Sequence, residues 1–122
     1  MTGSRRNQVL VVEDSADQAG LLRQYFEKAG CVVHVVGTGE EALAAAADLP
    51  PDLAVIDLML PGMGGWELIT RFREVVPECA IVVASVLDAS DFPVADAILP
   101  KPFTGAQVRQ VLADLTTLGR IP

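Results

Sequence analysis

Short apolar runs alternate along the chain with segments in which apolar residues recur every three or four positions. The first pattern is typical of strands buried on both faces, and the second is typical of helices that cover a sheet. The runs are rich in valine and isoleucine, which favour strands. The predicted strands cover residues 9–12, 31–36, 53–56, 80–84 and 97–99, and the predicted helices cover residues 15–29, 38–47, about 66–72 and 104–118.

Strands that alternate with helices predict a parallel sheet covered on both faces, and the near-continuous apolar strands agree with this arrangement. Right-handed connections between such strands give an open, doubly wound α/β domain. At 122 residues the chain has room for one domain. We expect this domain to cover residues 9–118, with tails at 1–8 and 119–122.

Local signals mark the ends of three predicted helices. Gly30 stands where a helix ends in a left-handed residue. Thr38 with Glu41, and Thr104 with Gln107, have the spacing of capping boxes at the starts of two others. The last helix carries an apolar stripe that we expect to face the core, formed by Val108, Val111, Leu112, Leu115 and Leu118.

Polar residues follow four of the five predicted strands. They are Glu13 and Asp14 after the first strand, Asp57 after the third, Ser85 after the fourth and Lys101 after the fifth. Ligands of doubly wound sheets bind outside the carboxyl ends of the strands, where the strand order reverses. We therefore expect these five side chains to converge on one site.

Three carboxylates in one pocket need a cation to remain ionised together. Two of them about 4 Å apart repel by roughly 4 kcal/mol at an effective dielectric constant near 20, and Lys101 supplies only one positive charge. Mg²⁺ prefers one or two carboxylates together with water and phosphate oxygens. The pattern therefore predicts a Mg²⁺ (or Mn²⁺) site that receives a phosphoryl group, with Asp57 as a carboxylate nucleophile.

The composition limits the partners and the location of the chain. The formal net charge is −7 and the basic residues are scattered, so we expect no direct contact with nucleic acid. No apolar stretch reaches the roughly 18 residues of a membrane span, and nothing at the start reads as a signal peptide. We expect a cytoplasmic protein in which Cys31 and Cys79 are buried and reduced.

Three segments carry a resemblance to a known family. Residues 9–15 read Val-Leu-Val-Val-Glu-Asp-Ser, residues 54–68 include Asp-Leu-Met-Leu-Pro-Gly-Met, and residues 99–103 read Leu-Pro-Lys-Pro-Phe. These segments resemble the receiver domains of two-component response regulators, with matching order and spacing over the first two thirds of the chain, and the similarity runs from about residue 8 to residue 118. The resemblance implies a flavodoxin-like, five-stranded parallel sheet with strand order 2-1-3-4-5.

The resemblance also implies a role for each site residue. The implied metal ligands are Glu13, Asp14, Asp57 and the backbone carbonyl of Met59, and the implied catalytic residues are Asp57, Ser85 and Lys101. Asp57 would take a phosphoryl group from the phosphohistidine of a sensor histidine kinase or a phosphotransfer protein, and phosphorylation would change the binding of a downstream protein. The bond between Lys101 and Pro102 resembles one that is cis in the family. Such a domain assists its own phosphorylation and dephosphorylation but is not a conventional enzyme.

The sequence departs from the family pattern between Ser85 and Lys101. These residues are 16 positions apart, about six fewer than is usual in receivers, so we expect the fourth helix to be shortened or absent. Residues 86–96 should form a solvated loop with an acidic tract of Asp88, Asp91 and Asp96. Ile98 stands where receivers carry an aromatic switch residue, so we expect residues 86–96 to transmit phosphorylation instead.

Most of the site residues also suit ordinary structural roles. Glu13 and Asp14 suit the dipole of the following helix, Ser85 suits a turn, and Lys101 suits a solvated loop. The glycines at 62, 64 and 65 are explained more simply by a turn than by a phosphate-binding loop. A pseudo-receiver would keep the fold as a docking module without being phosphorylated. A phosphohydrolase would need a second acid where this chain has Met59.

Overall fold

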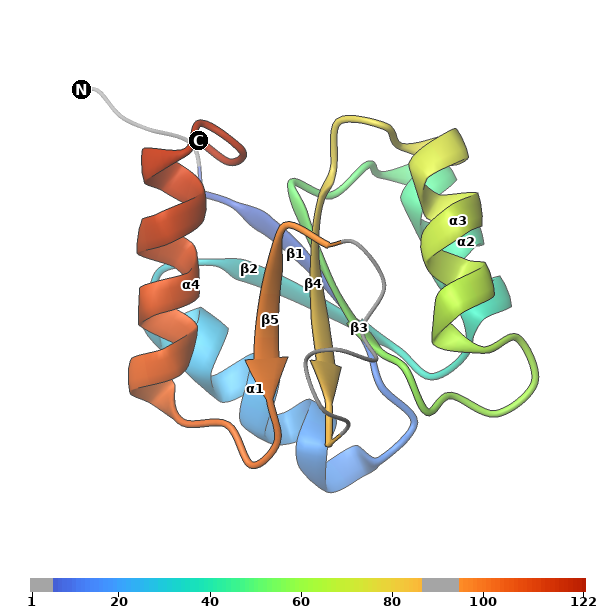
Figure 1. Cartoon of the computed structure of the whole chain (residues 1–122), viewed down its shortest axis with the longest axis horizontal. Helices are drawn as coiled ribbons and strands as arrows, with labels where there is room; N and C mark the ends of the chain where they lie inside the picture. The colour runs from blue at the N-terminus through green and yellow to red at the C-terminus, as the bar shows by residue number, and fades with distance from the viewer. Residues whose placement is uncertain (1–5, 87–94) are drawn as a thin grey trace.

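The structure, a computed structural model, describes residues 6–86 and 95–122. These residues form five strands and four helices (Figure 1). In chain order the elements are β1 (Gln8–Val12), α1 (Ala16–Lys28), β2 (Val32–Val36), α2 (Gly39–Asp48), β3 (Leu53–Asp57), α3 (Gly65–Val75), β4 (Ala80–Ser85), β5 (Ala97–Pro100) and α4 (Gly105–Thr117).

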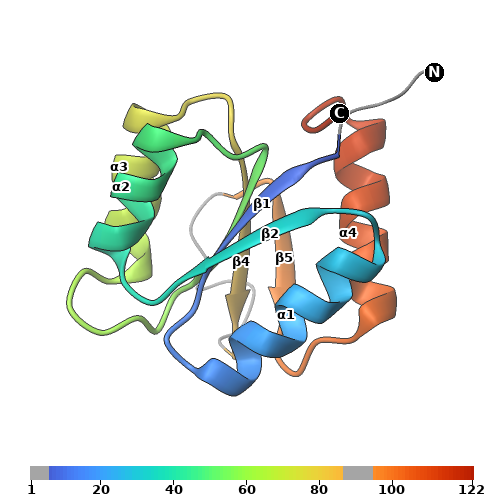
Figure 2. The same ribbon diagram turned by 180° about the vertical axis from the view of Figure 1, so that it is seen from behind.

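The five strands form one parallel sheet in the order β2-β1-β3-β4-β5, which confirms the predicted fold class and strand order. Helices α1 and α4 cover one face of the sheet, and helices α2 and α3 cover the other (Figures 1 and 2). Because the strands are parallel, their carboxyl ends lie at the same edge of the sheet. The residues that follow the strands are therefore brought to that edge.

Each face of the sheet carries its own hydrophobic core. Val9 and Val11 of β1 belong to the core beneath α1 and α4, whereas Leu10 and Val12 belong to the core beneath α2 and α3. This division follows from the alternation of side chains along a strand. Every residue of β3 and β4 is buried. Packing on both faces therefore fixes these central strands, and with them the polar residues at their carboxyl ends.

Side chains cap the helices largely as the sequence indicates. The Gln107 N–H donates to Thr104 Oγ1 at 3.2 Å and the Thr104 N–H donates to Gln107 Oε1 at 2.8 Å, which completes the predicted capping box of α4. Thr38 caps α2 by accepting from the Glu41 N–H at 3.1 Å. The Glu41 carboxylate accepts from the Gly37 N–H instead of the Thr38 N–H, so this second box is only half formed.

The end of α4 corrects one prediction. Helix α4 ends at Thr117, and the side chain of Leu118 is 69% exposed, so Leu118 does not belong to the core-facing stripe. The other members of the stripe are placed as predicted, with Val108, Val111 and Leu115 buried and Leu112 packed against the same core. Gly30, which follows α1, has the predicted left-handed conformation with φ of 93°.

The predicted shortening or loss of the fourth helix concerns residues 86–96, of which only residues 86, 95 and 96 are described. Asp88 and Asp91 lie in residues 87–94, outside the described residues. Asp96 is described, and its prediction as a solvated acid is wrong. Its carboxylate accepts from the Ile81 N–H at 2.8 Å and from Arg120 Nε at 2.9 Å. Asp96 therefore anchors the start of β5 to β4 and to the C-terminal segment.

The remaining structural predictions concern single residues. Cys31 and Cys79 are buried, free thiols, as expected. Burial raises the pKa of the Cys79 thiol to about 12. Among the described residues, no helix is long and apolar enough to cross a membrane.

Candidate functional site

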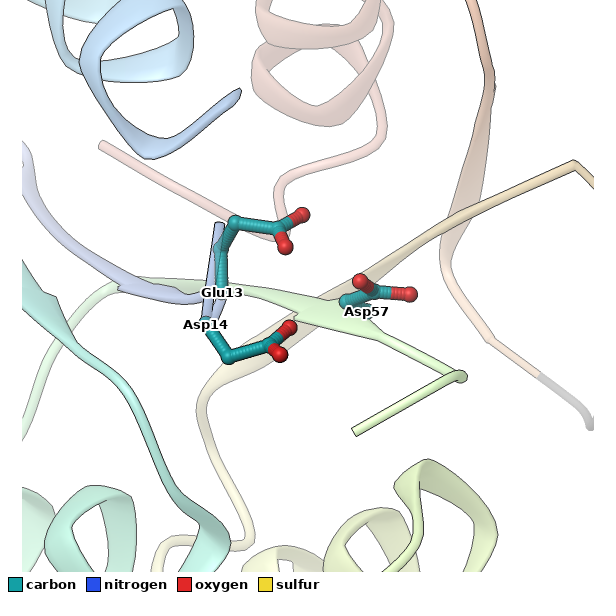
Figure 3. A group of neighbouring side chains, drawn as sticks. All are labelled: Glu13, Asp14 and Asp57. Atoms are coloured by element: carbon teal, nitrogen blue, oxygen red, sulfur yellow. The ribbon is translucent and has the colours of Figure 1, made fainter. Parts of the chain in front are cut away.

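The site is built from residues at the carboxyl ends of β1, β3, β4 and β5. Glu13 and Asp14 follow β1, and Asp57 is the last residue of β3. One carboxylate oxygen from each of these three residues lies within 4.8 Å of the other two. Figure 3 shows the three side chains pointing toward one another from neighbouring strands. The predicted convergence of the three acids is present.

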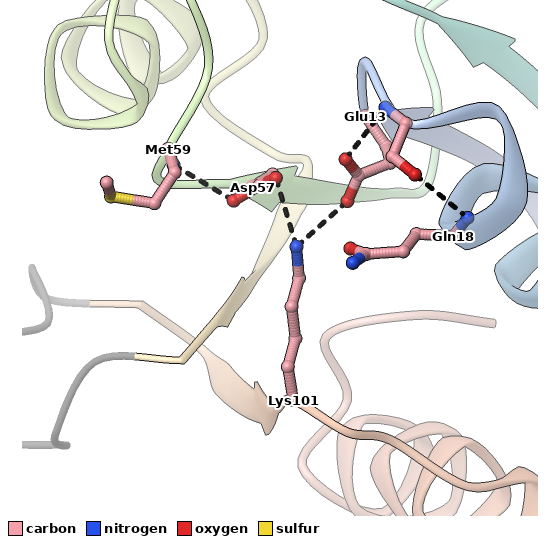
Figure 4. A network of polar contacts seen from close by, with 6 residues as sticks. Glu13, Gln18, Asp57, Met59 and Lys101 are labelled. Carbon is pink, nitrogen blue, oxygen red and sulfur yellow. Dashed lines mark hydrogen bonds and ion pairs between the residues drawn. The ribbon is translucent and has the colours of Figure 1, made fainter.

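Lys101, which follows β5, joins two of the acids. Its ammonium donates to Glu13 Oε1 at 3.1 Å and to Asp57 Oδ2 at 3.1 Å (Figure 4). Glu13 is 3% exposed and Asp57 is 4% exposed, so these charges interact in surroundings that screen them little. Lys101 is therefore not a solvated loop residue, and its amine is held at the centre of the site.

Backbone amides hold both buried carboxylates. The Ser15 N–H donates to Glu13 Oε2 at 3.1 Å, and the Met59 N–H donates to Asp57 Oδ1 at 2.9 Å. Burial raises the pKa of Glu13 and the negative charge of Asp57 adds to this effect, while the Ser15 N–H and Lys101 oppose it. The ionised form of Glu13 is therefore less favourable than it would be in water, and further positive charge nearby would stabilise it.

The donor set fits a hard divalent cation. Three carboxylates and one ammonium leave two negative charges without compensation among the described residues of the site. Oxygen ligands on opposite sides of Mg²⁺ are about 4.2 Å apart, since each lies about 2.1 Å from the ion. The three carboxylate oxygens lie within 4.8 Å of one another, so they face a common position where such an ion would bind. Asp14 is exposed, which leaves the site open on one side.

Ser85 and Met59 occupy the same edge. Ser85 ends β4 and is buried, and its carbonyl accepts from the Lys101 N–H at 2.9 Å. The Met59 side chain is exposed while its backbone lies beside Asp57. The Lys101–Pro102 peptide bond is cis, as the resemblance implies. All the residues predicted for the site are therefore gathered at the carboxyl edge of the sheet.

Sequence reasoning did not single out Gln18, which lies in α1 beside Lys101 (Figure 4). The Gln18 Oε1 atom is buried and has no hydrogen-bond partner among the described residues. A cavity of about 160 Å³ adjoins it, lined by Gln18, Leu21, Lys101, Pro102 and Phe103. The only sequence signal was that Gln18 is one helical turn beyond Asp14, a spacing that many surface residues of a helix share.

Comparison with known proteins agrees with this fold. The family model of the response regulator receiver domain matches residues 9–113. The chain belongs to this family, whose members are signalling domains.

Individual relatives and solved structures extend this result. The chain is 34% identical over 103 residues to the DNA-binding response regulator MtrA of Mycolicibacterium paratuberculosis. The aligned region covers 80% of this chain and 46% of that protein. The chain thus spans about half the length of that relative. The CheY-like receiver domain from Methylobacillus flagellatus superposes with a TM-score of 0.84 at 27% identity, over 91% of this chain and 99% of the other. The receiver domain of a LuxO repressor protein from Vibrio parahaemolyticus gives 0.83 at 27% identity, over 94% of both chains.

Proposed function

We propose that this chain is a phosphoacceptor that takes a phosphoryl group on Asp57 from the phosphohistidine of a sensor histidine kinase or a phosphotransfer protein. The reaction depends on Mg²⁺ (or Mn²⁺), and the phosphorylated form binds a downstream protein differently. The observation that carries the proposal is the clustering of Glu13, Asp14 and Asp57 around a shared position, with Lys101 bonded to two of them. The proposal includes the cytoplasmic location expected from the sequence.

Asp57 performs the chemistry as the nucleophile. One of its carboxylate oxygens forms a bond to phosphorus while the bond between phosphorus and the donor imidazole nitrogen breaks, and the electron pair returns to the imidazole. The Met59 N–H, which donates to Asp57 Oδ1, holds the carboxylate in a fixed orientation. Because Asp57 is buried and held from both sides, little reorganisation is needed before the attack.

The other side chains hold the phosphoryl oxygens and the cation. Glu13, Asp14, Asp57 and the Met59 carbonyl would bind the cation, which supplies positive charge to the phosphoryl oxygens when it is bound. Lys101 lies within reach of Asp57 and pairs with a second oxygen of the phosphoryl group. The hydroxyl of Ser85, at the end of the adjacent strand, donates to another.

The proposal also covers how phosphorylation at Asp57 is transmitted to a partner. The family carries an aromatic switch residue at the position of Ile98. In this chain the position holds an aliphatic side chain, which is exposed on β5. We keep the expectation that residues 86–96 transmit phosphorylation; residues 87–94 of this segment lie outside the described residues, and Asp96 pairs with Arg120. The relative MtrA is a DNA-binding regulator, but this acidic chain is proposed to act on a protein.

Incubation with a small phosphodonor and Mg²⁺, followed by intact mass spectrometry, tests the proposal. We expect one phosphate adduct in the wild type and in Asp48→Asn, whose side chain is exposed at the end of α2. We expect none in Asp57→Asn. A wild-type chain that gains no phosphate from any donor would favour the pseudo-receiver, and an adduct that persists in Asp57→Asn would place the phosphoacceptor elsewhere.

A further inference from the structure

Helix α3 begins against the backbone of the phosphoacceptor. Its first residue, Gly65, is buried, and the Gly65 N–H donates to the Leu58 carbonyl at 3.4 Å. A Cβ atom at position 65 would lie 2.5 Å from the Leu58 Cα atom and 2.9 Å from the Asp57 carbonyl oxygen. Both of these are backbone atoms, so neither can be moved by rotating a side chain.

The requirement for glycine at position 65 is steric and not conformational. Gly65 opens a helix and its φ is not positive, whereas Gly62 in the same loop has φ of 70°. Alanine at an open helical position normally stabilises a helix relative to glycine. At position 65 the contact with Leu58 would be 0.9 Å shorter than the 3.4 Å at which ordinary contacts begin. The clash therefore outweighs the gain in helix propensity.

The displacement should fall on the end of β3 and not on α3. Helix α3 is held by three buried side chains, Leu68, Ile69 and Phe72. Leu58 lies one residue beyond β3, and its backbone is tied to β4 by one long bond, from its N–H to the Ala84 carbonyl at 3.3 Å. Leu58 has one buried side chain and this one bond beyond the end of the strand, whereas α3 is packed along its length, so we expect the Asp57–Leu58 backbone to give way.

We propose that Gly65 is a positioning residue of the phosphoacceptor site, because the missing side chain lets α3 hold the Asp57–Leu58 backbone where the Asp57 carboxylate reaches both the cation and the phosphoryl group. This inference rests on the proposed function. Metal ligands must lie within about 0.2 Å of their ideal distances, and a misplacement of about 1 Å in a reacting group slows a reaction about 100-fold. A shift of several tenths of an ångström at Asp57 therefore affects metal binding and phosphoryl uptake.

The neighbouring glycine provides a matched control. Gly64 caps the same helix, a Cβ atom at position 64 would meet nothing within 4 Å, and its φ of −69° suits alanine. Gly20, in the middle of α1, also has open space around it. Gly20→Ala should stabilise the fold at a distance from Gly65, so it serves as the host background for both test variants.

The test compares Gly65→Ala with Gly64→Ala in the Gly20→Ala background. Calorimetry gives the Mg²⁺ dissociation constant, intact mass gives the rate of phosphoryl uptake at saturating Mg²⁺, and urea unfolding with a chelator gives the stability without metal. We expect Gly65→Ala to weaken Mg²⁺ binding at least tenfold and to slow phosphoryl uptake 10- to 100-fold while it remains folded. We expect Gly64→Ala to stay within twofold of the host in its Mg²⁺ dissociation constant and in its rate of phosphoryl uptake.

Two results would overturn the positioning role. A folded Gly65→Ala chain that matches the host in Mg²⁺ affinity and uptake rate shows that the site tolerates the side chain. A Gly65→Ala chain that does not fold even in the Gly20→Ala background shows that the glycine is needed only for folding. If the host itself binds no Mg²⁺ and takes no phosphoryl group, the proposed function fails instead.

Discussion

Lys101 is the residue that balances charge in the described part of the site. Its ammonium lies 3.1 Å from one oxygen of Glu13 and 3.1 Å from one oxygen of Asp57, and both carboxylates are buried. Removing one partner of a buried ion pair leaves the other charges without compensation, which destabilises a fold more than the loss of a surface pair does. Lys101 therefore has a structural effect in addition to its proposed contact with the phosphoryl group.

Lys101→Met keeps most of the side-chain length and removes the charge. We expect it to lower the free energy of unfolding without metal by about 3 kcal/mol. We also expect tighter Mg²⁺ binding, because a positive charge beside the cation is lost, and phosphoryl uptake about 100-fold slower, because one phosphoryl oxygen loses its partner. Urea unfolding, calorimetry and intact mass measure these changes. Lys28→Met, exposed in α1, is the control, and equal stability of the two variants would contradict the argument.

At the scale of elements, Asp96 and Arg120 join three parts of the chain. The Asp96 carboxylate accepts from the Ile81 N–H of β4 and from Arg120, which lies beyond α4. Burial alone would raise the pKa of Asp96, but the hydrogen bonds from Arg120 and the Ile81 N–H, together with the positive charges nearby, lower it overall. The pair therefore stabilises the fold only while Asp96 is ionised.

The direction of the Asp96 pKa shift predicts how the stability of the fold changes with pH. Because the pKa of Asp96 is lower in the folded chain than the ordinary value of 3.8, its contribution is present above that value and is lost as the pH falls through the folded pKa. We expect Asp96→Asn to lower the free energy of unfolding by about 1 kcal/mol at pH 7, since the Arg120 side chain is 35% exposed and the pair is partly screened. Chemical denaturation at pH 7 and below pH 3.8 should show this difference shrink, and a difference independent of pH would contradict the role of the charge.

The elements themselves were predicted from the sequence because their signals are local. The strands and the Thr104–Gln107 box depend on residues that are close in sequence, whereas the strand order was implied by the resemblance to receiver domains. Asp96 was placed wrongly because its partner Arg120 is 24 positions away and belongs to no motif. Leu118 was placed wrongly because the helical period continues past the point where α4 ends. Gln18 and the close approach of Gly65 depend on tertiary packing and carry no local signal.

At the scale of the whole molecule, the parallel sheet concentrates negative charge at one edge of an already acidic chain. The formal net charge is −7, and three acids from two strands meet at the carboxyl edge. The fold thus carries an electrostatic strain at the site that a divalent cation relieves. A ligand that binds only the folded state stabilises it in proportion to the logarithm of its concentration relative to its dissociation constant.

Mg²⁺ is therefore expected to stabilise the chain as a whole. At 100 times its dissociation constant, Mg²⁺ should raise the free energy of unfolding by about 2.7 kcal/mol. Thermal or urea unfolding with and without Mg²⁺ measures this gain. At that Mg²⁺ concentration the gain should be smaller in Asp14→Asn, which lacks one proposed ligand, and should persist in Asp48→Asn. An equal gain in all three chains would show that Mg²⁺ acts away from the acid cluster.

The Mg²⁺ dependence of phosphoryl uptake tests the central claim most directly, namely that the gathered acids bind a cation and thereby allow Asp57 to accept phosphate. The rate at which the phosphate adduct forms is measured by intact mass across a Mg²⁺ titration at constant ionic strength. We expect the rate to be half-maximal at the Mg²⁺ dissociation constant measured by calorimetry, and to fall to background with a chelator or in Asp57→Asn. An adduct that forms equally fast with and without Mg²⁺ would contradict the account.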